Sequence, residues 1–174
     1  MRSWGGSVRW EQNLVHDVGD ETIALHCGHA NVATNNILAA GQQCRGTSCS
    51  PHAYLYGCEF GQPNEFDFTK NVVYMAAPED NLFVSYAIYG NATYADNLYY
   101  SENSDHELNF PNVAQNATNL TFAEWQATGQ DKGSVQGDPR FVDFAARNFA
   151  LRPDSPLHAM GFVPIDASAA GPRL

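Results

Sequence analysis

The feature of this sequence that most constrains its fold is an asparagine that recurs at the start of short apolar segments. It occurs in QNLV, NNIL, KNVVYM and DNLYY, where the asparagines are Asn13, Asn36, Asn71 and Asn97. Successive asparagines are 23, 35 and 26 residues apart, and the longest interval contains a cysteine-rich segment. If about a dozen residues of that interval form an inserted loop, the unit has a nearly constant length, as in stacked repeat architectures.

Short strand-like segments lie between these asparagines, among them TIALHC, NVAT, FDFT and LFVSYAIYG. They are rich in β-branched and aromatic residues and are bounded by Gly, Asn or Asp. A unit of short strands cannot bury its apolar side alone, so we expect copies to stack with parallel pairing between successive units. An inward asparagine could then bond the next one along the stack, because its amide both donates and accepts. The alternative is that asparagine merely favours turns.

With this repeat over roughly residues 7 to 110, the sequence resembles right-handed parallel β-helix proteins, the class that includes pectate-lyase-like domains. The C-terminal part resembles the segment that closes many such proteins, on the marks Trp125, GQD, Ser134, DPRFVD, FALRPDSPLHAMGF and the final GP. The resemblance implies an all-β fold, a right-handed parallel β-helix forming a single solenoid. The coils would span residues 1–120, with a loop insertion at about 41–60, and a C-terminal cap would span 121–174.

The expected cap has a physical purpose, since an open end of stacked strands leaves unpaired backbone groups and an exposed interior. We expect apolar side chains of the cap to plug that interior, namely Phe141, Phe149, Leu151 and Leu157. One short helix is predicted within Leu120–Gly129, with Thr121 as N-cap and Glu124 three residues later.

Sequons and cysteines indicate a secreted chain. N-glycosylation sequons occur at Asn91, Asn116 and Asn119, and the cysteines are Cys27, Cys44, Cys49 and Cys58. Three of the cysteines lie in one polar segment, which favours disulfides over reduced core thiols, although sequence cannot choose the pairing. Because MRSWGGSVRWEQ lacks the apolar core of a signal peptide, we expect the C-terminal fragment of a longer chain or a truncated gene. The protein is expected to be a monomer or part of a longer chain.

The charge balance excludes some partners. Nine Lys and Arg face 19 Asp and Glu, a formal net charge of −10, which repels nucleic acid and anionic lipid. No apolar run approaches the ~20 residues of a membrane span, so no membrane insertion is expected.

The densest set of chemically active side chains lies in HDVGDETIALHCGH. Strand alternation through TIALHC directs His26 outward, where it could act as a general acid or base beside acidic corner residues. The candidate catalytic residues are His26, Asp20, Glu21 and His16. Calcium is a possible cofactor, with Asp17, Asp20 and Glu21 as candidate ligands. The alternative is a solvated turn followed by a surface histidine.

Other residues suit carbohydrate chemistry without forming a catalytic motif. Paired carboxylates of a glycoside hydrolase could come from Asp20, Glu21, Glu59, Asp67, Glu79 and Asp80. Outward tyrosines could stack on sugar rings, the candidates being Tyr54, Tyr56, Tyr86, Tyr89, Tyr94, Tyr99 and Tyr100. We therefore expect an extracellular protein that acts on a polysaccharide or glycan, as a polysaccharide lyase or glycoside hydrolase. The alternatives are a non-catalytic carbohydrate-binding or adhesion module, or a fragment without the active site.

Overall fold

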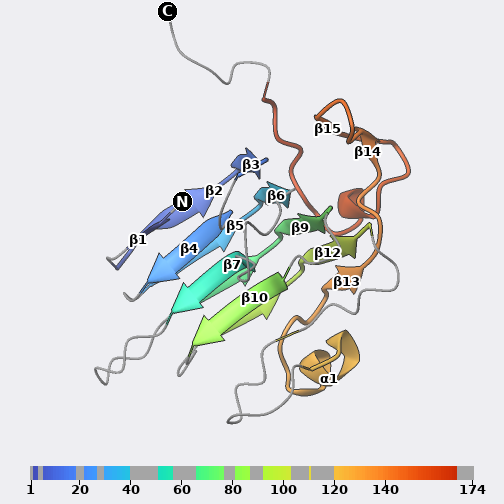
Figure 1. Ribbon diagram of the computed structural model, residues 1–174. Helices are drawn as coiled ribbons and strands as arrows, with labels where there is room; N and C mark the ends of the chain where they lie inside the picture. The colour runs from blue at the N-terminus through green and yellow to red at the C-terminus, as the bar shows by residue number, and fades with distance from the viewer. Residues whose placement is uncertain are drawn as a thin grey trace, which may run out of the picture.

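The computed structural model describes residues 2–3, 6–18, 22–26, 30–39, 51–56, 66–76, 81–86, 92–102, 110 and 120–167. Their strands form three parallel sheets and one antiparallel pair (Figure 1). From β1 (Arg2–Ser3) to β12 (Leu98–Ser101), each parallel sheet takes every third strand along the chain, and β13 (Val135–Gln136) joins the sheet of β12. Within these residues, no helix is long and apolar enough to cross a membrane.

The three parallel sheets are named A, B and C. Sheet A contains β1 (Arg2–Ser3), β4 (Ile23–His26), β7 (Pro51–Tyr56) and β10 (Asn81–Tyr86). Sheet B contains β2 (Arg9–Glu11), β5 (Asn31–Thr34), β8 (Phe66–Thr69) and β11 (Ala92–Ala95). Sheet C contains β3 (Leu14–His16), β6 (Ile37–Ala39), β9 (Val72–Met75), β12 (Leu98–Ser101) and β13 (Val135–Gln136).

A two-residue corner leads from each of the strands β2, β5, β8 and β11 of sheet B into the next strand of sheet C. Its first residue has a left-handed backbone, with φ of 55°, 53°, 54° and 56° at Gln12, Asn35, Lys70 and Asp96. Few residues other than glycine adopt this conformation, and Asn and Asp adopt it most readily. The second residue of each corner is one of the four repeated asparagines.

The repeated asparagines form a ladder of hydrogen bonds. The Nδ2 atoms of Asn13, Asn36 and Asn71 donate to Oδ1 of the following asparagine at 3.0, 2.9 and 3.4 Å. The backbone N–H of each of these three residues donates to the same oxygen. Asn36, Asn71 and Asn97 are completely buried, so the ladder satisfies polar groups that would otherwise be costly to bury.

A buried carboxylate ends the ladder. The Asn97 Nδ2 donates to Asp131 Oδ1 at 2.9 Å, and the Asn97 N–H donates to Ser134 Oγ at 2.7 Å. Asp131 also accepts from Trp125 Nε1 at 2.5 Å, from Ser134 Oγ at 2.6 Å and from the Tyr99 hydroxyl at 3.0 Å. An ionised carboxylate only accepts hydrogen bonds, so it closes a ladder in which every asparagine donates toward it.

The first core lies between the sheets. It contains inward side chains of all three, including Ile23 from sheet A, Phe68 from sheet B and Val73 from sheet C. Phe110 and Trp125 are buried in the same cluster. Trp125 belongs to α1 (Phe122–Ala127), which has the predicted capping box between Thr121 and Glu124. The prediction of one short helix here is confirmed.

A second core lies on the outer face of sheet C. The C-terminal segment covers this face with the hairpin β14 (Phe141–Asp143) and β15 (Asn148–Leu151), followed by the 3₁₀ turn η1 (Pro156–His158). In Figure 1 the orange and red segment passes beside β12, β9, β6 and β3. The buried residues of this core are Ile37, Ala39, Val72, Tyr74, Leu98, Phe141, Phe149, Leu157 and Phe162.

The structure corrects two predictions. The prediction of a right-handed parallel β-helix that forms a single closed solenoid is wrong. The described strands form separate sheets, strand pairing runs only within each sheet, and no closed solenoid is present among them. The proposed plug is also wrong, since Phe141, Phe149 and Leu157 pack on the outer face of sheet C, with Leu151 partly buried against them. The reason is that sheet C is apolar on both faces and needs cover on both.

Candidate functional site

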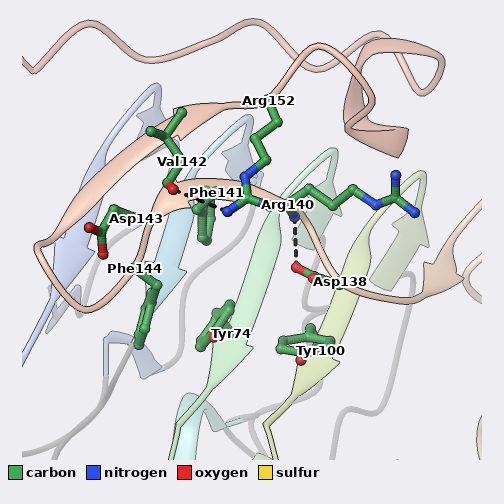
Figure 2. A pocket seen from close by; sticks show the side chains of 9 residues that line it. All are labelled: Tyr74, Tyr100, Asp138, Arg140, Phe141, Val142, Asp143, Phe144 and Arg152. Carbon is green, nitrogen blue, oxygen red and sulfur yellow. Dashed lines mark hydrogen bonds between the residues drawn. The ribbon is translucent and has the colours of Figure 1, made fainter.

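A groove of about 350 Å³ lies between the outer face of sheet C and the hairpin β14–β15 (Figure 2). This volume is within the range of about 300–1,000 Å³ that is typical of small-molecule sites. Its lining combines aromatic and charged side chains: Tyr74, Tyr100, Asp138, Arg140, Phe141, Val142, Asp143, Phe144 and Arg152.

Three aromatic rings form a row along the groove. Tyr74 and Tyr100 are direct partners in the pairing of β9 with β12, and their ring centroids are 5.0 Å apart. Phe144 stacks on Tyr74 from the hairpin side, with centroids 4.0 Å apart and planes inclined by 22°. Tyr74 is buried, whereas Tyr100 and Phe144 are half-buried. The two ends of the row are therefore accessible from the groove.

The charged side chains of the groove also hold the hairpin in shape. Asp138 Oδ1 accepts the Arg140 backbone N–H at 2.7 Å, and Asp143 Oδ1 accepts the Ala146 N–H at 3.0 Å. Arg152 Nη2 donates to the carbonyl of Val142 at 3.3 Å (Figure 2). These contacts fix the positions of the charges around the aromatic row.

An ion pair holds one of the arginines of the groove. The Arg140 guanidinium pairs with Asp154, which follows β15. In Figure 2 the Arg140 side chain points away from Tyr74. Its charge is therefore balanced within the hairpin region.

The two tyrosines of the groove both have raised pKa values. The Tyr74 hydroxyl donates to Glu102 Oε1 at 2.6 Å. Burial, and then the carboxylate of Glu102, raise the pKa of Tyr74 well above its usual value. Burial raises the pKa of Tyr100 as well, with further contributions from the negative charges of Asp138 and Glu102.

The described part of the predicted catalytic cluster lies at the edge of the second core. His16 ends β3, and its Nδ1 lies 2.7 Å from Asp17 Oδ2. Asp17 accepts two hydrogen bonds of 2.6 Å from Arg147, which holds the pKa of Asp17 below its usual value. The His16 ring lies 5.0 Å from that of Phe149, and the Arg147 guanidinium lies 5.0 Å from the centre of the Phe144 ring. These contacts attach the hairpin to β3.

The other candidate residues are only partly described. Asp20 and Glu21 lie outside the described residues, and His26 is placed in β4 without a described side chain. The catalytic and calcium predictions therefore stay predictions, although a calcium ion at Asp17 would compete with Arg147. Within the ranges that the structure describes, no group of three or more His, Cys, Asp or Glu could hold a metal. Also outside those ranges are Cys27, Cys44, Cys49, Cys58, Asn91, Asn116 and Asn119.

Some of the tyrosines predicted to stack on sugars are buried in the core, and one lines the groove. Tyr94 and Tyr99 are buried in the first core, while Tyr100 lines the groove. Sequence reasoning missed Tyr74, although a usable pattern exists. Tyr74 and Tyr100 each lie three residues after a ladder asparagine, so parallel pairing sets them side by side on one face. The hairpin residues of the groove were not recognised as a binding surface.

No family model, no curated protein and no solved structure matches this chain. The resemblance to pectate-lyase-like proteins therefore stays a prediction.

Proposed function

We propose that the protein binds carbohydrate, without cleaving it, in the groove between sheet C and the hairpin. The observation that carries this proposal is the aromatic row, in which Tyr100 and Phe144 are half-buried beside fixed charged groups. An aromatic ring can pack against the apolar C–H face of a sugar, while nearby polar groups bond its hydroxyls. The extracellular location expected from the sequons is part of the same proposal.

The contacts of the charged residues favour binding over catalysis. A glycoside hydrolase needs two carboxylates on either side of the scissile bond, one as acid and one as base or nucleophile. Asp138 and Asp143 instead accept backbone N–H groups of their own turns, and Arg140 is paired with Asp154. Positions that are fixed by the hairpin suit recognition of a ligand, and they give no acid–base pair.

The test is binding of oligosaccharides to the wild-type protein and to two variants of Tyr100. A glycan array identifies ligands, and calorimetric titration measures their affinity. Tyr100→Ala should weaken binding on the order of ten-fold, which corresponds to about 1.4 kcal/mol. The matched control, Tyr100→Phe, keeps the ring and should retain most of the affinity. Thermal unfolding of both variants verifies that the fold is intact.

Two results would overturn this proposal. The first is that no glycan binds, and the second is that Tyr100→Ala binds as well as the wild type. Release of reducing ends or of unsaturated products from a polysaccharide panel would replace binding alone by an enzymatic function.

A further inference from the structure

The charges around the groove point to a class of ligand. We infer that the groove selects uncharged sugar units and discriminates against uronates. This inference rests on the proposed carbohydrate binding, and it concerns which glycans enter the same site.

Two arginines near the groove are already neutralised. Arg140 is paired with Asp154, and Arg147 forms a two-bonded pair with Asp17. Arg152 is the remaining arginine of the lining, and its described hydrogen bond goes to a backbone carbonyl. One guanidinium is therefore available to interact with a ligand.

Two carboxylates outside these pairs line the groove, and a third, Glu102, lies beside the lining. Asp138 and Asp143 belong to the lining, and Glu102 accepts the hydroxyl of Tyr74 at 2.6 Å. Among the described residues, none of the three forms an ion pair. Asp138 and Asp143 in the lining, with Glu102 beside it, outnumber the charge of Arg152. The charges in and around the groove therefore sum to a negative value, on a chain whose formal net charge is −10.

The Tyr100 ring, one of the two half-buried rings of the row, lies near these carboxylates. Burial raises the pKa of Tyr100, and the negative charges of Asp138 and Glu102 raise it further. A uronate stacked on Tyr100 would bring its own carboxylate within reach of the same charges. At physiological ionic strength the screening length is about 8 Å, so neighbouring charges around one small groove still repel.

A neutral sugar is not repelled by the carboxylates and can form hydrogen bonds with them. Its hydroxyl groups are donors as well as acceptors, and the carboxylates of the groove only accept. Asp138 and Glu102 can therefore bond sugar hydroxyls, while Arg152 can donate to a hydroxyl or ring oxygen. Hydrogen bonds to charged groups are stronger than neutral ones, so the acidic lining favours uncharged, hydroxyl-rich ligands.

The experiment uses the full chain and pairs of oligosaccharides that share one sugar backbone, with the carboxyl groups charged in one member and esterified in the other. Galacturonan oligomers with free carboxylates are compared with their methyl esters, and mannuronan oligomers with their methyl esters. The neutral member of each pair should bind on the order of ten-fold more tightly, which corresponds to about 1.4 kcal/mol. Raising the salt concentration should bring the ratio of the two affinities closer to one, because screening weakens the repulsion of the uronate.

A double variant, Glu102→Gln with Asp138→Asn, tests the source of the selectivity. Both substitutions keep a hydrogen-bond acceptor for Tyr74 and for the Arg140 N–H, and they remove the two charges. The ratio between neutral and uronate ligands should fall toward one. A ratio that stays unchanged in the variant would overturn the assignment of selectivity to these carboxylates.

The failures of the two proposals are distinguishable. If uronates bind as tightly as their neutral partners, or more tightly, and Tyr100→Ala still weakens binding, the inference on ligand class fails and carbohydrate binding stands. If neither member of any pair binds, and the neutral glycans of the array also fail to bind, carbohydrate binding itself fails.

Discussion

Sheets B and C share the first core, yet their outer faces are opposite in character. In sheet B the outward side chains of Asp67 and Thr93 are exposed to solvent. In sheet C the corresponding outer face carries Val72 and Leu98, and each of these is 0% exposed. The difference shows that the C-terminal segment adds its layer to sheet C and leaves these positions of sheet B uncovered.

The strand sequences record this difference. FDFT in β8 alternates buried and solvent-facing residues, whereas all four residues of VVYM in β9 are buried. Alternation is typical of a sheet with one solvent-exposed face, and a continuous apolar run is typical of a sheet with both faces buried. The groove exists because the covering layer meets sheet C incompletely at Tyr100 and Phe144, which stay half-buried.

The largest expected contrast comes from truncating one outward side chain on each sheet. Leu98→Ala should lower the free energy of unfolding by about 2–5 kcal/mol, because a buried cavity is left in the second core. Thr93→Ala, on the exposed face of neighbouring β11, should change it by less than about 0.5 kcal/mol. Urea denaturation of both variants measures the difference. Similar losses at the two positions would contradict the comparison.

The corner between the sheets offers the next contrast. Asn36 bonds the Trp10 carbonyl, and its Oδ1 accepts the Asn13 N–H. Asn36→Ala removes these bonds inside the stack, and each unsatisfied buried group costs about 1–3 kcal/mol. We expect a loss of about 2–4 kcal/mol in chemical denaturation. Asn13→Ala, at a half-buried position, should lower the free energy of unfolding by less than Asn36→Ala does. A larger loss for Asn13→Ala would show that the contribution of a ladder asparagine does not depend on its burial.

Sequence reasoning was most successful where neighbouring repeats carry the information. The spacing of Asn13, Asn36, Asn71 and Asn97 predicted mutual contacts, and the structure has hydrogen bonds between each consecutive pair. The helix was predicted from Thr121 and Glu124, because a capping box is a local interaction between residues three apart. Both patterns depend on short-range rules that the sequence states directly.

Prediction failed where a segment had a choice of apolar surfaces. Phe141, Phe149 and Leu157 are apolar, but their identity does not tell whether they cover the end of the sheets or the outer face of sheet C. The continuous run VVYM was the available clue that sheet C had two faces to bury. The groove was missed for the same reason, since it exists only once the hairpin lies on this sheet.

A smaller effect is expected from the contact that fastens the end of the covering layer. Asn35 Nδ2 donates to the Val163 carbonyl at 2.7 Å, and Asn35 Oδ1 accepts the Val163 N–H at 2.7 Å. Asn35→Gly removes both bonds and keeps a residue that tolerates φ of 53°. We expect a loss of about 1 kcal/mol, with faster hydrogen exchange in the C-terminal segment than in sheet B.

Uniform acceleration over both sheets would contradict this prediction. The control is Lys70→Gly, which changes the equivalent left-handed residue of the next corner. No contact of the Lys70 side chain with the C-terminal segment is described, so exchange in that segment should remain at the wild-type rate.

The smallest effect concerns two ion pairs, one on each outer face. Arg9 and Glu11 pair at 2.6 Å within β2 on the bare face of sheet B, whereas Arg147 and Asp17 pair across 130 residues and hold the hairpin to β3. Asp17→Asn should lower stability at neutral pH by at most about 1 kcal/mol, as for other solvent-accessible pairs. Glu11→Gln should have a smaller effect, because its partner lies on the same strand and secures no second layer.

The stability that the Asp17–Arg147 pair contributes should decrease at acidic pH. Arg147 holds the pKa of folded Asp17 below its usual value, which is about 3.9 in an unfolded chain. The stabilisation that ionised Asp17 gives to the folded protein is therefore complete above that pH. It is lost as the pH falls through the lower pKa of the folded state. The difference in unfolding free energy between wild type and Asp17→Asn should shrink as the pH falls below about 4. A difference that does not shrink between about pH 4 and about pH 2 would mean that Asp17 does not hold the hairpin through its charge.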